Sequence, residues 1–291
     1  MKMIHKKFYS AQEFVHWIEN TPVVWKDKIL FSQAEHQHKT QTENFEEAIK
    51  LAKYGWPEGL KLLAKEVKDH EEILEIPHRP MKKYDVAGVR PDPGRAAAGD
   101  MFSMVVKGNT KKAKPVLKIA TRMTFGGDIP ADDVMHWGAA ICSYVNMLER
   151  EGYAVELTSR YENRAPSTFK VGPDVCVEVL LKKPEHPLAL SSVAFWWAHP
   201  SSLRRIKFAA FERMDIEKWY SRSYGIADNV LPVPADTLYL TIEDAGDSMQ
   251  ENLQIIKDKH RAIFEQQKIA VPRFFNAGQG AARRPDGLSP R

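Results

Sequence analysis

The sequence predicts an α/β protein with a three-layer arrangement, in which helices cover both faces of a central sheet. Three neighbouring segments carry this prediction. Val116–Ala120 is a short β-rich run, a long helical pattern follows it, and Tyr153–Leu157 is a second β-rich run. A long helix between two strands predicts a parallel, right-handed crossover, because parallel strands of one sheet are joined in this way.

The crossover helix has recognisable ends and one apolar side. Asp132 or Asp133 is expected to cap its start, and Gly152 is expected to close it. Between them, apolar residues recur at steps of three and four, the spacing of one helix face: Val134, Trp137, Ile141, Val145 and Leu148. This pattern predicts a helix that packs on the sheet through a narrow apolar seam.

Residues 1–76 predict a helical N-terminal region. Ser10 and Glu13 have the spacing of a capping box, and Asn44 and Glu47 repeat it at the start of a second helix. Gly55 follows the second helix and is a favourable residue to end it. We therefore expect core-facing helices before the sheet begins.

Residues 77–115 differ from the preceding region in composition and predict a basic connector. Five prolines and four glycines exclude long regular elements from much of this segment. It holds nine Lys and Arg residues against three Asp, so its positive excess is larger than that of the whole chain. The basic character of the protein is therefore concentrated here.

The α/β domain is predicted to span residues 116–276. Asp174–Leu181 is apolar on both faces, as a central strand is, and Thr237–Ile242 is the last expected strand. Asp247 is expected to cap a long final helix. From residue 277 to 291 the composition turns to Gly, Ala, Arg and Pro, which predicts a disordered tail.

The composition is that of a soluble globular protein. The 291 residues are 43% hydrophobic and 27% charged, with a mildly basic formal net charge of +4. The two cysteines, Cys142 and Cys176, are expected to be buried free thiols, and their lack of companion ligands argues against a structural zinc site. No apolar run approaches the roughly 20 residues that span a bilayer, and no secretion signal is recognisable, so we expect no membrane contact and a cytoplasmic location.

Ligands of open α/β sheets bind at the carboxyl ends of strands, which directs attention to the loops after Ala120 and Ile242. The first loop lacks the glycine spacing of a phosphate-binding loop. Thr121, Arg122 and Thr124 are nevertheless candidates to hold an anion against backbone amides. The alternative is a plain surface turn.

The second loop groups three carboxylates, Glu243, Asp244 and Asp247. Such oxygen ligands suit Mg²⁺, and a metal-assisted phosphoryl transfer would use them. The alternative is structural: Asp247 caps the following helix, and the other two carboxylates lie near its positive end. No cofactor is predicted apart from this candidate Mg²⁺ site.

The succession of strand, hydroxyl-bearing loop, long helix and second strand resembles the opening of a von Willebrand factor A-type, Rossmann-like domain. That family's metal site begins with Asp-x-Ser-x-Ser directly after the first strand. Here the corresponding residues are Ala120-Thr121-Arg122-Met123-Thr124, so two hydroxyls are kept, the carboxylate is missing and Arg122 adds a positive charge. The resemblance implies the fold, and the departures argue against a divalent-metal site of that family's kind.

The chain as a whole is similar to an uncharacterised family of tailed-bacteriophage proteins. The segments that carry this resemblance are Phe8–Phe14, Gly55–Gly59, Asp85–Gly88 with Ala98–Met101, and Trp137–Ile141 with Leu148–Leu157. It implies a phage or prophage origin and expression inside a bacterial cell, and it supplies no catalytic residues.

Basic residues beside aromatic ones suggest a nucleic-acid surface. Phe195, Trp196 and Trp197 are near a basic cluster and would stack bases if they were exposed, but the alternative is that they are core aromatics. The candidate phosphate contacts are Arg79, Lys82, Lys83, Lys111, Lys112, Lys114, Arg204, Arg205 and Lys207.

These observations favour a non-enzymatic binding or assembly protein with a protein partner, because the ligand loops lack each standard catalytic signature. One alternative is a nucleic-acid-binding protein that uses the basic segment 79–114. The other is a metal-dependent phosphodiesterase or phosphotransferase that uses the loop at 243–247.

Overall fold

The computed structural model describes residues 3–25, 30–33, 37–59, 61, 84–85, 90–91, 93–97, 103–105, 116–165, 172–186, 188, 190–218, 220 and 224–267. Predictions for the tail at 277–291 and for most of the connector lie outside these residues.

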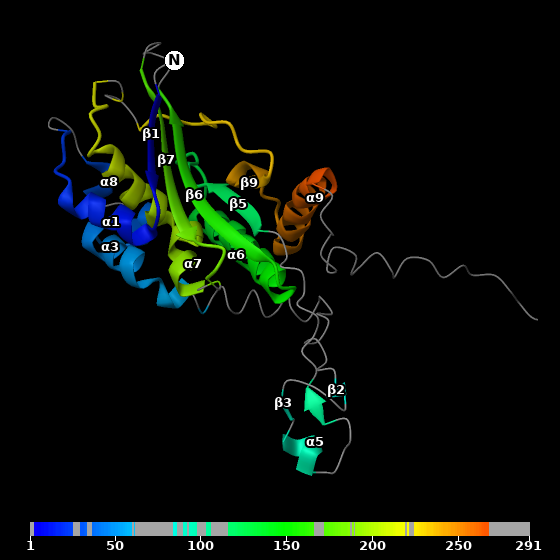
Figure 1. The fold of residues 1–291 in the computed structure, drawn as a ribbon. Coiled ribbons are helices and arrows are strands. Elements are labelled where there is room, and N and C mark those ends of the chain that lie inside the picture. The colour runs from blue at the N-terminus through cyan, green and yellow to red at the C-terminus, as the bar shows by residue number, and fades with distance from the viewer. Residues whose placement is uncertain are drawn as a thin grey trace, which may run out of the picture.

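A six-stranded mixed sheet forms the centre of the molecule (Figure 1). Its order is β1-β7-β6-β5-β9, and β8 pairs with β6. Neighbours are parallel in the pairs β5/β6, β5/β9 and β1/β7, and antiparallel in β6/β7 and β6/β8. The strands are β1 (Met3–Phe8), β5 (Val116–Arg122), β6 (Ala154–Arg164), β7 (Asp174–Lys182), β8 (Ile226–Ala227) and β9 (Thr237–Thr241).

A second, smaller sheet lies within the segment predicted as a connector. It has the antiparallel order β2-β4-β3, made by β2 (Tyr84–Asp85), β3 (Arg90–Pro91) and β4 (Met104–Val105), and helix α5 (Pro93–Ala97) follows β3. The segment therefore contains short regular elements, and some of its prolines and one of its glycines lie within them.

The remaining helices of the described residues come before, between and after the strands. They are α1 (Ala11–Asn20), α2 (Gln37–Thr40), α3 (Phe45–Tyr54), α6 (Ala131–Arg150), α7 (Leu190–Ala198), α8 (Phe208–Phe211) and α9 (Met249–Gln267), with the 3₁₀ turns η1 (Phe31–Gln33) and η3 (Ile242–Asp244) and the π-helical η2 (Ser202–Lys207).

The predicted crossover is confirmed, because α6 connects β5 to β6 and the two strands are parallel neighbours. The helix begins earlier than predicted: Pro130 is its N-cap, so Asp132 and Asp133 lie in its first turn, near the positive end of the helix dipole. Gly152 ends the helix as expected, with a φ of 84° that favours glycine. The predicted seam is buried, and so are residues outside it such as Tyr144.

Helices α7, α1 and η2 pack on one face of the sheet, which we call the helix face. Trp197 of α7 donates its Nε1–H to Ser159 Oγ at 3.0 Å, and the ring of Phe14 of α1 lies 6.1 Å from that of Tyr161. Lys207 of η2 donates to Asn163. Ser159, Tyr161 and Asn163 alternate along β6, so their side chains point to the same side of the sheet.

Helices α6 and α9 lie on this same face. A Cβ atom at Gly138 of α6 would come within 2.5 Å of the Trp197 carbonyl oxygen, so α6 and α7 are in direct contact. Tyr144 of α6 is hydrogen-bonded to His260 of α9 at 2.5 Å. The prediction of three layers is therefore wrong for the described residues: their helices form one layer, and the other side of the sheet, the open face, carries none of them.

The N-terminal region begins with a strand, and not with a helix as predicted. Met3–Phe8 forms β1 and pairs with β7 in parallel. Phe8, Phe14 and Trp196 belong to one buried core, so residues before and after the connector share the same interior. The architecture is therefore mixed α/β, with parallel and antiparallel neighbours in one central sheet.

The helix starts show how local hydrogen bonding decides capping. Ser10 Oγ accepts the N–H of Glu13 at 3.0 Å, and Asn44 Oδ1 accepts the N–H of Glu47 at 2.8 Å, as predicted. The cap of α9 is Ser248, one residue after the predicted Asp247, because its hydroxyl accepts the N–H of Glu251 at 3.2 Å.

Candidate functional site

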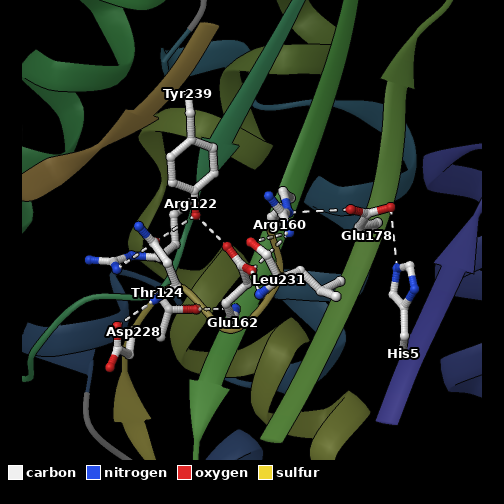
Figure 2. A network of polar contacts seen from close by, with 10 residues as sticks. His5, Arg122, Thr124, Arg160, Glu162, Glu178, Asp228, Leu231 and Tyr239 are labelled. Atoms are coloured by element: carbon white, nitrogen blue, oxygen red, sulfur yellow. Dashed lines mark hydrogen bonds and ion pairs between the residues drawn. The ribbon is translucent and has the colours of Figure 1, made fainter. Parts of the chain in front are cut away.

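A network of charged side chains lies on the open face of the sheet, and a buried ion pair on β6 is its centre (Figure 2). Glu162 is fully buried, and its Oε1 lies 2.9 Å from Arg160 Nη2. The same oxygen accepts the backbone N–H of Leu231 at 3.2 Å, and the other accepts the hydroxyl of Tyr239. The carboxylate thus has partners for both oxygens, as a buried charge requires.

Toward β7 and β1 the network continues through a second carboxylate. Arg160 Nε lies 3.2 Å from Glu178 Oε1, and Glu178 Oε2 lies 3.3 Å from His5 Nε2. Figure 2 shows Arg160 between Glu162 and Glu178, with His5 on the far side of Glu178. Cys176 is paired in register with both His5 and Glu162, so its side chain lies on this face as well. Burial raises the pKa of the Cys176 thiol, although the nearby Arg160 opposes the shift.

Toward β9 the network joins the two loops that the sequence singled out. Arg122 Nη1 donates to Asn229 Oδ1 at 2.9 Å, and Arg122 Nη2 lies 2.5 Å from Glu243 Oε1. The hydroxyl oxygen of Tyr239 lies 2.9 Å from Asn229 Oδ1, and burial beside Glu162 raises the pKa of this hydroxyl. The loops after β5 and β9 therefore meet, as expected for the carboxyl ends of parallel neighbours.

The predicted anion loop does not assemble as an anion site. Arg122 is paired with Glu243, and Thr124 Oγ1 accepts the backbone N–H of Glu162 at 2.9 Å. Thr121 is fully buried and, by its register with Ser159, points to the helix face. The three side chains are thus separated or already engaged, because alternate residues of a strand point to opposite sides.

The predicted metal loop is also dispersed. Glu243 is held by Arg122, while Asp244 Oδ2 accepts the N–H of Thr241 at 3.0 Å and lies 2.5 Å from Lys259 Nζ. Asp247 is exposed near the start of α9. In the part of the chain that the structure describes, three potential ligands do gather elsewhere: His5, Cys176 and Glu178 lie with their donor atoms within 4.8 Å of one another.

Three basic residues of the predicted nucleic-acid surface lie in the described part of the chain, and none of the three is exposed. Arg204, Arg205 and Lys207 are buried, and burial lowers the pKa of each. Arg205 donates to the carbonyl of Ser32 at 3.0 Å and to the hydroxyl of Thr42 at 2.6 Å, so it cross-links its own chain. The prediction is wrong for these three side chains, because phosphate contacts require exposed cations.

The other predicted phosphate contacts lie outside the described residues: Arg79, Lys82, Lys83, Lys111, Lys112 and Lys114. The aromatic cluster is placed, and Phe195, Trp196 and Trp197 are all buried in the core. The core alternative for these aromatics is therefore the one that the structure confirms.

A cavity of about 490 Å³ lies away from the network, between the start of α1, the end of α3 and the end of β7. Lys53 and Lys182 are among its lining residues, but Lys53 Nζ lies 2.6 Å from Glu19 and Lys182 Nζ lies 2.7 Å from Glu149. These two cations are already paired, so the cavity is a poorer candidate for a charged ligand than the open face.

The fold and the network together define a mixed α/β protein whose sheet has a helix layer on one face and a polar cluster on the other. The chain belongs to the family described as a domain of unknown function (DUF7192), whose family model matches residues 2–271. No curated protein and no solved structure matches the chain. The expectation of an uncharacterised family is thereby confirmed.

Among the described residues, none of the helices is both long and apolar enough to cross a membrane.

Proposed function

We propose that this protein is a non-enzymatic binding protein and that it attaches to a protein partner through the open face of its sheet. The observation that carries the proposal is the one-sided helix layer. Sheets built from parallel neighbours are normally covered on both faces, because their connections place helices on each side. The described helices leave this face free, and the side chains around its buried centre, such as Lys118, are therefore suited to contact a partner.

The chemistry of this face favours a protein over a nucleic acid. Two of its cations are paired with carboxylates: Lys118 Nζ lies 2.6 Å from Asp236, and Arg164 Nη1 lies 2.8 Å from Asp228. A phosphate backbone would have to displace these carboxylates before it gained the cations. A protein surface with charges of both signs can instead interleave with such pairs.

The proposed protein is encoded by a phage or prophage gene and acts in the cytoplasm of a bacterial cell. Its resemblance to von Willebrand A-type domains concerns the fold only. A map of the neighbouring genes tests the origin, since a phage gene is expected among other phage genes. A bacterial housekeeping context would contradict it.

The binding proposal is tested by charge reversal on the open face. Lys118→Glu changes an exposed residue of β5, and Lys50→Glu makes the same change on the exposed side of α3. Tagged full-length protein is used to capture partners from lysate of the producing cell, with and without nuclease. We expect one protein to be captured in both lysates by the wild type and by Lys50→Glu, and about tenfold less of it by Lys118→Glu, because like charges would face each other.

Equal capture by the two variants would contradict the open face as the binding surface. Capture that disappears after nuclease treatment would favour the nucleic-acid alternative. Hydrolysis of a phosphodiester by the purified protein, lost in Asp244→Ala, would favour the metal-dependent enzyme and overturn the proposal.

A further inference from the structure

Three side chains with the donor atoms of a transition-metal site meet on the open face. His5 lies on β1, and Cys176 and Glu178 lie on β7, its parallel neighbour. Cys176 and Glu178 are two residues apart on one strand, and His5 is in register with Cys176, so all three point to the same side. The pairing of β1 with β7 is therefore what brings the imidazole to the thiol and the carboxylate.

The spacing of the donor atoms suits a small tetrahedral ion. His5 Nε2 and Glu178 Oε2 are 3.3 Å apart, and all three donor atoms lie within 4.8 Å of one another. Zinc bonds of the usual lengths place a nitrogen and an oxygen ligand about 3.4 Å apart and a sulfur and a nitrogen ligand about 3.6 Å apart.

The donor set selects the class of metal. Imidazole and thiolate are the ligands of zinc and related transition metals, whereas Mg²⁺ and Ca²⁺ take oxygen ligands. We propose that His5, Cys176 and Glu178 form a binding site for a divalent zinc ion. Three protein ligands leave a fourth position for water or another ligand, and the His5 side chain, 38% exposed, offers the ion a path from solvent.

The surroundings supply the supporting shell that such a site needs. Arg160 Nε lies 3.2 Å from Glu178 Oε1, the oxygen that does not face His5, so the guanidinium attracts that oxygen and leaves the other one toward the imidazole. The charge is also balanced. The Cys176 thiolate and Glu178 neutralise the two positive charges of the ion, and Glu162 neutralises Arg160 at 2.9 Å.

Zinc binds cysteine as the thiolate, so the Cys176 thiol gives its proton to solvent as its sulfur bonds to zinc. The release gives the site a signature that a simple ion pair between His5 and Glu178 lacks.

The test uses the reduced full-length protein after treatment with a chelator. Zinc is added, and bound metal per chain, proton release and the unfolding temperature are measured. Cobalt is added in parallel, since a thiolate ligand gives a characteristic charge-transfer absorption. We expect one zinc per chain, release of protons on binding, a raised unfolding temperature and the cobalt–thiolate band.

The chain offers matched controls for each ligand. Cys176→Ala is compared with Cys142→Ala, the other buried free cysteine, and His5→Ala is compared with His136→Ala, an exposed histidine of α6. Loss of either ligand is expected to weaken zinc binding at least about 100-fold, more than the loss of a supporting residue does, and both controls are expected to bind as the wild type does. His5→Ala changes an exposed side chain, so its result does not depend on the tolerance of the core.

The proposal is overturned if the reduced protein binds no stoichiometric zinc, if cobalt gives no thiolate band, or if Cys176→Ala and His5→Ala bind zinc as tightly as their controls. None of these measurements depends on a protein partner, so they are independent of the binding function proposed above.

Discussion

The two faces of the sheet compensate buried positive charge in different ways. On the helix face, Arg205 is fully buried with hydrogen bonds to carbonyl and hydroxyl groups such as those of Ser32 and Thr42. On the open face, Arg160 is almost fully buried between two carboxylates, Glu162 and Glu178. The first arrangement cross-links distant loops, whereas the second gathers ionisable groups at a single place. In these two examples, the ionisable groups that contact one another are therefore on the open face.

The largest effect is expected on the helix face, where apolar packing dominates. Trp197→Ala removes a fully buried indole and its hydrogen bond to Ser159, which should lower the free energy of unfolding by about 3–5 kcal/mol. Chemical denaturation measures this change. Val116→Ala, at an exposed position of β5, is the control and should change stability by less than about 0.5 kcal/mol. A small effect at Trp197 would mean that the helix layer is not packed as described.

The second effect concerns the cost in stability of breaking a buried ion pair compared with an exposed one. Arg160→Leu leaves Glu162 buried without its cation, and we expect a loss of about 3 kcal/mol in the free energy of unfolding. Lys118→Ala breaks an exposed pair with Asp236 and should cost at most about 1 kcal/mol, less in high salt. Denaturation at two salt concentrations compares them. Equal costs would remove the distinction between the buried network and the surface of the open face.

A third effect, in the pH dependence of stability, should belong to the helix layer. Burial lowers the pKa of His199 to about 4 and that of His260 to about 3, below the value near 6.5 of an unfolded chain. The unfolded chain therefore takes up protons first as the pH falls, so stability present above about pH 6.5 is lost toward pH 4, by at most about 1.4 kcal/mol per pH unit for each histidine.

His199→Gln should make the decline of stability between pH 6.5 and 4 shallower, as measured by denaturation at a series of pH values. His136→Gln, at an exposed position of α6, is the control and should follow the wild type. A decline that is as steep in His199→Gln as in the control would show that His199 does not cause it.

Local and sequential features were the ones that could be predicted from the sequence. The crossover of β5, α6 and β6 was recognisable because both strands and the helix are contiguous in the chain. The caps at Ser10 and Asn44 depend on residues only three positions away. The cap of α9 was missed by one position, since Asp247 and Ser248 are both favourable capping residues and only the backbone path distinguishes them.

Features that depend on distant segments could not be predicted in this way. Met3–Phe8 is a strand because β7 offers it a partner, and its own sequence gives little sign of this. Cys176 had no companion ligand in sequence, yet the sheet places His5 beside it. The alternation of side chains along the segments that form β1 and β7 could be recognised in the sequence. It did not indicate which residues would meet, because the register between the two strands was unknown.

The pairing of β1 with β7 has a consequence for biosynthesis. The strand is made first, but its partner is made only roughly 170 residues later, which takes on the order of ten seconds or more at ordinary translation rates. Until then Phe8 and the other core residues near the start of the chain have no interior to enter. A nascent chain is thus expected to complete this edge of the sheet late, and the pairing of His5 with Cys176 marks the moment at which β1 finds its partner strand.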